Sequence, residues 1–94
     1  MVYNIDLTWV SPDEGGKIFQ PKTDEYFCTT VLIDLNKGKS TWSIKLIFSE
    51  EQPLKAKLQF LFDTYPNNLI DIGDTIKLFE GPNVVGYALI KSIE

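Results

Sequence analysis

The chain has 94 residues, 44% of them hydrophobic and 23% charged, an ordinary balance for a soluble globular protein. It contains no histidine, and all nine of its basic residues are lysine. These absences exclude imidazole acid–base catalysis, zinc sites built on histidine, and bidentate guanidinium contacts to phosphate. Thirteen acidic residues outweigh the lysines and give a net charge of −4, which argues against nucleic acid as a partner. We expect residues 1–94 to form a single domain.

The first half of the chain predicts three strands. Residues 3–9 alternate apolar and polar side chains, the pattern of a strand that is buried on one face. Turn-forming residues 11–16 end this strand, and residues 26–35, rich in β-branched side chains, predict the second. A hairpin turn is expected around Gly38, because glycine accepts a positive φ. The third strand directs four apolar side chains inward: Trp42, Ile44, Leu46 and Phe48.

The second half predicts three further strands. In the fourth, four apolar side chains alternate with polar ones and are expected to face inward: Ala56, Leu58, Phe60 and Phe62. Turn residues 65–68 follow, and a tight turn at Gly81, Pro82 and Asn83 separates strands at residues 75–80 and 84–93. The pattern predicts an all-β sandwich or barrel. We favour a small, closed, antiparallel six-stranded β-barrel, because closure leaves no open strand edge.

No motif predicts catalysis, a metal site or a cofactor. Gly38-Lys39-Ser40 resembles the end of a phosphate-binding loop, but position 33 is isoleucine instead of the required glycine. Asp71 and Asp74 lack the spacing of a calcium loop and fit turn chemistry better. Cys28 lies in a predicted strand and has no histidine to activate it. We therefore expect a protein that is not an enzyme.

The predicted cellular setting is cytoplasmic. Residues 1–6 lack the basic region and the apolar run of a secretory signal. A single cysteine leaves no internal disulfide, and no segment reaches the roughly 18 apolar residues of a membrane span. We expect no contact with a membrane.

Three stretches of the sequence, taken in order, resemble motifs of one family. Residues 13–17, 27–30 and 80–90 are similar to an acidic-Gly-Gly-Arg turn, a Phe-Arg-Thr-Thr strand start and a closing Glu-Gly-x-x-Thr-Val-Gly-x-Gly segment. These belong to the C-terminal β-barrel, the third domain, of translation elongation factor Tu. The resemblance spans about residues 5–94 and implies a barrel of six antiparallel strands. In that family the barrel helps to hold the T-stem of transfer RNA and packs against the GTPase and middle domains.

The sequence departs from the family at positions that carry function. Lys17, Cys28 and Phe79 stand where the family has arginine, and Val84 and Ala88 replace a threonine and a glycine. The resemblance therefore implies the fold without the basic contacts to transfer RNA. It also implies tight turns or close backbone contacts at four glycines: Gly15, Gly16, Gly81 and Gly86.

We expect a non-catalytic barrel that binds another protein. The segment after the first strand combines charge with apolar side chains, which are typical anchors of an interface. The expected partner-binding residues are Asp13, Glu14, Lys17, Ile18, Phe19, Tyr26 and Tyr87. Ile18 and Phe19 fit an alternative equally well, in which they close one end of the barrel.

Two other functions are alternatives. A translation-related RNA- or tRNA-binding protein would show a cluster of basic residues on its surface and salt-sensitive binding. An enzyme or a small-ligand carrier would need an interior cavity of about a few hundred cubic ångströms. The interior of a barrel of this size is usually filled by side chains.

Overall fold

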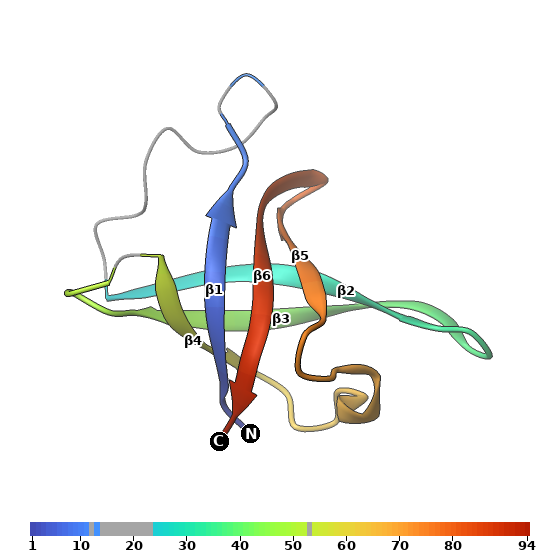
Figure 1. Ribbon diagram of the computed structural model, residues 1–94. Helices are drawn as coiled ribbons and strands as arrows, with labels where there is room; N and C mark the ends of the chain where they lie inside the picture. The colour runs from blue at the N-terminus through green and yellow to red at the C-terminus, as the bar shows by residue number, and fades with distance from the viewer. Residues whose placement is uncertain (12, 14–23, 53) are drawn as a thin grey trace.

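The computed structural model describes residues 1–11, 13, 24–52 and 54–94, and these form one closed antiparallel barrel. Its strands follow each other around the barrel in the order β1-β4-β3-β2-β5-β6 (Figure 1). The strands are β1 (Tyr3–Trp9), β2 (Glu25–Asp34), β3 (Gly38–Phe48), β4 (Lys55–Phe60), β5 (Thr75–Glu80) and β6 (Asn83–Ile93). A 3-10 helix, η2 (Asn67–Leu69), lies between β4 and β5. The expected all-β class and six-stranded closed barrel are confirmed.

Alternating side chains build the core. On β1, Tyr3, Ile5 and Leu7 are buried, whereas Asn4 and Asp6 face outward. The other strands contribute buried apolar residues in the same way: Leu32, Ile44, Leu46, Leu58, Ile76, Leu78, Val85 and Ile90. Complete burial of one such side chain contributes about 1.5–3 kcal/mol, so this interior is the main source of stability.

A cluster of aromatic rings occupies each end of the barrel. At one end, Trp9 contacts Tyr26 edge-on, with their ring centroids 5.9 Å apart, and Phe48 packs against both. At the other end, Phe60 stacks on Tyr65 at 3.9 Å, and the hydroxyl groups of Tyr3 and Tyr65 lie 2.7 Å apart. The two clusters fill the barrel with side chains at its ends.

The seam between β2 and β5 is the shortest in the barrel. A single residue pair, Thr29 with Phe79, joins these strands, whereas five pairs join β3 to β4. Thr30, the next residue of β2, is completely buried, and its hydroxyl donates to the Lys77 carbonyl at 2.7 Å. This side-chain bond therefore supplements the short backbone ladder.

The β2–β3 hairpin extends beyond the rest of the barrel (Figure 1). In its turn, the Asp34 carboxylate accepts the Asn36 N–H at 2.8 Å, and Gly38 adopts a φ of 85°. The expectation that the second strand reaches residue 35 is wrong by one residue, because this turn begins there. Leu35 consequently sits at the tip of the hairpin and is 98% exposed.

The expected inward position of Phe62 is also wrong. β4 ends at Phe60, and Phe62 is 59% exposed in the connection that follows. The alternation of β4 cannot continue there because Pro66 and Tyr65 redirect the chain towards η2, where Tyr65 supplies the buried ring. Elsewhere in the third and fourth strands, the expected inward residues pack in or against the core.

Candidate functional site

The predicted partner-binding residues fall into two groups. Asp13 is exposed, whereas Glu14, Lys17, Ile18 and Phe19 lie outside the described residues, as do the two glycines expected in a turn, Gly15 and Gly16. Tyr26 is half-buried in the Trp9 cluster, and its hydroxyl hydrogen-bonds to Glu80. Tyr87 faces outward from β6, opposite Lys77 of β5 and Thr8 of β1. Tyr26 and Tyr87 therefore do not share one surface.

The two described candidate glycines have different structural settings. Gly81 has a φ of 58° in the turn between β5 and β6, a conformation that costs other residues energy. Gly86 is buried on β6, where an added Cβ would lie 2.9 Å from the Thr8 carbonyl oxygen and 3.1 Å from the Trp9 ring. These glycines serve the barrel itself.

The described residues offer little reactive chemistry. Burial raises the pKa of the Cys28 thiol to about 12, so the thiolate nucleophile is scarce at neutral pH. Burial, and then the hydrogen bond to Tyr65, raise the pKa of Tyr3 well above its usual range. Within the described ranges, no group of three or more Cys, Asp or Glu side chains could hold a metal ion. None of the helices in this part of the chain is long and apolar enough to span a membrane.

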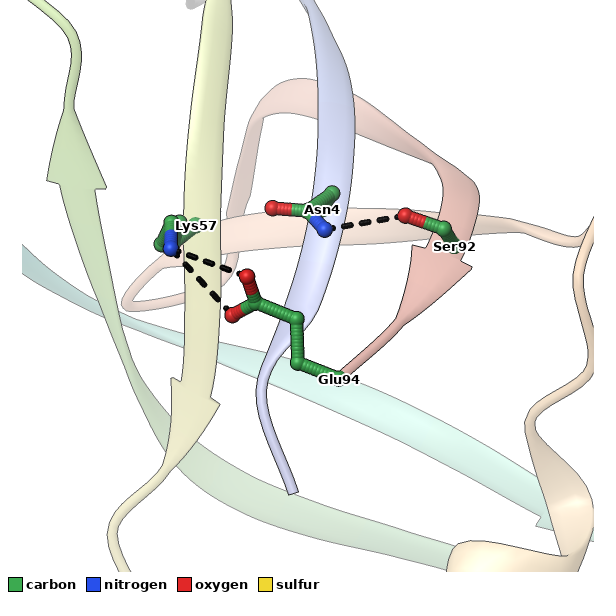
Figure 2. A network of polar contacts seen from close by, with 4 residues as sticks. All are labelled: Asn4, Lys57, Ser92 and Glu94. Atoms are coloured by element: carbon green, nitrogen blue, oxygen red, sulfur yellow. Dashed lines mark hydrogen bonds and ion pairs between the residues drawn. The ribbon is translucent and has the colours of Figure 1, made fainter.

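A groove of about 340 Å³ lies on the outer surface over β1, β3 and β4. Its polar lining includes Lys55 and Lys57, whose charges are already paired. Lys55 lies 2.9 Å from an Asp6 carboxylate oxygen, and Lys57 lies 3.0 Å from Glu94. Figure 2 shows Lys57 reaching both oxygens of Glu94 beside the Asn4–Ser92 hydrogen bond. The groove thus lies outside the barrel, on a surface where ion pairs connect β4 to β1 and to the C-terminal residue.

The outer face of β2 differs from the outer faces of β1 and β4. The outward residues of β1 and β4 are all polar or charged: Asn4, Asp6, Thr8, Lys55, Lys57 and Gln59. β2 and its turn instead present an apolar row that we call the β2 outer stripe: Phe27, Val31, Ile33 and Leu35. Phe27 is 57% exposed and Ile33 is 59% exposed. From Phe27 to Ile33 the outer face of β2 is therefore mostly apolar, with Thr29 as its polar residue.

Lysine side chains border the β2 outer stripe. Across the β2–β3 ladder, Ile33 is opposite Lys39 and Phe27 is opposite Lys45. Lys37 lies in the turn beside Leu35, and Lys77 of β5 is next to the single β2–β5 pair. An exposed apolar row with a charged border has the general form of an interface core and its rim.

The sequence analysis did not identify this surface. Its signal is the run of eight residues from Tyr26 to Ile33 without a charge. A strand that is buried on both faces has this pattern, whereas a strand with one face in water usually alternates. The run predicts a strand, and it also indicates that a second face of this strand is mostly apolar.

A comparison of the chain with protein-family models, with curated proteins and with solved structures found no match.

Proposed function

We propose that this protein is a non-catalytic barrel that binds another protein through the β2 outer stripe. The observation that carries the proposal is the mostly apolar outer face of β2, with Ile33 and Leu35 exposed on a projecting hairpin. A side chain that is already 98% exposed contributes almost nothing to the barrel, and it gains apolar contact area only when a partner covers it.

We also propose descent from the C-terminal barrel of elongation factor Tu. The glycine turn at residue 81 and the close backbone contact at Gly86 support this relationship, because both lie in the segment that resembles the family's closing motif. Common ancestry of a fold does not imply a common function, however, and one fold often supports unrelated binding sites in different proteins.

The test is capture of partners by the tagged full chain, followed by mass spectrometry. The double variant Ile33→Ser, Leu35→Ser removes apolar area from the β2 outer stripe while both positions are exposed in the folded chain. The matched control is Leu54→Ser, which removes a leucine that is 55% exposed on the β3–β4 connection. A partner that is lost with the double variant and kept with the control supports the proposal. Identical partners with all three proteins would contradict it.

RNA or transfer RNA is the second candidate. The specific observation in its favour is the exposed ring of Phe27 opposite Lys45, with Lys39 and Lys77 further along the same surface, since bases stack on aromatic rings in positively charged grooves. Filter binding of transfer RNA at about 20–200 mM salt tests this function, with about 100- to 500-fold weakening expected across that range for three lysine–phosphate contacts. Absence of binding at the lowest salt concentration would remove it.

A further inference from the structure

The lysines around the β2 outer stripe specify the charge of its partner. Among the described residues, Lys37, Lys39 and Lys77 form no ion pair, whereas Lys45, Lys55 and Lys57 each have an acidic partner. The nearby carboxylates are already engaged: Asp34 accepts backbone N–H groups of the hairpin turn, and Glu25 pairs with Lys45 at 3.9 Å. Asp34 keeps its negative charge, so the four lysines around the stripe (Lys37, Lys39, Lys45 and Lys77) exceed the carboxylates of Asp34 and Glu25 by two charges, in a chain whose net charge is −4.

The strand register brings one of these lysines directly beside the stripe. The Leu61 N–H donates to the Ser43 carbonyl, so the backbone groups of Ser43 point towards β4 and away from β2. Alternation along an antiparallel ladder then makes Ile33–Lys39 a pair without mutual backbone hydrogen bonds. In such pairs the two Cα atoms approach to about 4.5 Å and the side chains lie close together. A ligand that covers Ile33 thus meets the Lys39 ammonium group at its edge.

We propose that the β2 outer stripe binds an acidic apolar segment of another protein, with apolar side chains over Ile33 and Leu35 and carboxylates facing Lys37, Lys39 and Lys77. This inference rests on the proposed function and adds the chemistry of the partner. Opposite charges at the rim raise the association rate and select the register, while the apolar contacts provide most of the affinity.

Two other occupants fit this surface less well. A second copy of the chain, packed stripe against stripe about a two-fold axis, would bring the lysines of both copies into the same region and repel. Nucleic acid would satisfy the lysines, but the ring of the stripe, Phe27, lies six residues along β2 from Ile33, so bases stacked on Phe27 would leave Ile33 and Leu35 uncovered.

The experiment is a selection of displayed random 16-residue peptides against the full-length protein, with the Ile33→Ser, Leu35→Ser variant used for counter-selection. We expect the enriched peptides to combine at least two apolar residues with Asp or Glu. Their affinity should fall about tenfold for the counter-selection variant and stay unchanged for Leu54→Ser. Circular dichroism of each variant checks that the barrel is intact.

Charge reversal separates the inference from the proposed function. Lys39→Glu should weaken the acidic peptides about tenfold, and peptides in which Glu is exchanged for Lys should recover binding to that variant. Stripe-dependent peptides that are neutral or basic would overturn the acidic partner and leave the proposed function standing. Peptides that bind the serine variant as well as the original chain would overturn both. Preferential binding of a single-stranded RNA probe, lost with Lys39→Glu, would also overturn both.

Discussion

The hydroxyl of Thr30 is expected to hold the β2–β5 seam together, and Thr30→Val tests this role. Valine has nearly the same shape as threonine, so the substitution removes the donor to the Lys77 carbonyl without opening a cavity. Thr30 is completely buried, and leaving a partly buried acceptor unsatisfied costs about 1–2 kcal/mol. In a domain of this size, that loss lowers the midpoint of thermal unfolding by about 5–12 °C.

Urea unfolding followed by tryptophan fluorescence measures this effect. The midpoint should fall while the m-value stays constant, because the surface exposed on unfolding does not change. Thr29→Val is the matched control, since Thr29 faces outward on the same strand and its hydroxyl takes no part in the seam. We expect the control to change the free energy of unfolding by less than about 0.5 kcal/mol. Equal stability of Thr30→Val and the original chain would refute the assigned role.

Three further predictions follow from the packing. Gly86→Ala should lower the free energy of unfolding by about 1–3 kcal/mol in the same urea assay, because the added Cβ would lie 2.9 Å from the backbone of β1. An unchanged free energy of unfolding would mean that the two strands move apart easily at this point. Lys57→Ala should cost about 0.5 kcal/mol or less, because the pair with Glu94 is about half exposed, and a loss above 1.5 kcal/mol would contradict that view. The free energy of unfolding should fall between pH 9.0 and about 12, because the unfolded Cys28 thiol ionises before the folded one. In Cys28→Ala the free energy of unfolding should fall less over this pH range. An identical pH profile for the two proteins would show that folding does not raise the pKa of the Cys28 thiol.

Much of the barrel follows from local sequence patterns. Period-two alternation identifies the buried face of β1, and turn residues around Gly38 and Gly81 identify the hairpins that join neighbouring strands. These signals succeed because one face of each strand must be buried and because tight turns have strict backbone requirements.

The features that local patterns miss depend on distant parts of the chain. The burial of Tyr65 and the exposure of Phe62 are decided by where β4 ends against the rest of the barrel, which alternation alone does not show. The sequence alone does not show the β2 outer stripe, because it does not show where β4 and β5 stop pairing with the β2–β3 hairpin. Beyond that point Ile33 and Leu35 are exposed, and this exposure distinguishes the stripe from a strand that is covered on both sides. Position in the sheet order, not composition, therefore decided the candidate site.

Closure of the barrel between its first and last strands has a consequence for the order of folding. β1 pairs along its whole length with β6, and the Glu94 N–H donates to the Val2 carbonyl at 2.7 Å, so the two chain ends lie side by side. The hairpins β2–β3, β3–β4 and β5–β6 can form from neighbouring residues, but the β1–β6 seam must wait until β6 has been synthesised. β6 begins at Asn83, 74 residues after β1 ends at Trp9, so at roughly 5–20 residues per second one edge of β1 stays open for about 4–15 s. During that interval the nascent chain exposes the apolar residues that later fill the core, and it is then most vulnerable to aggregation.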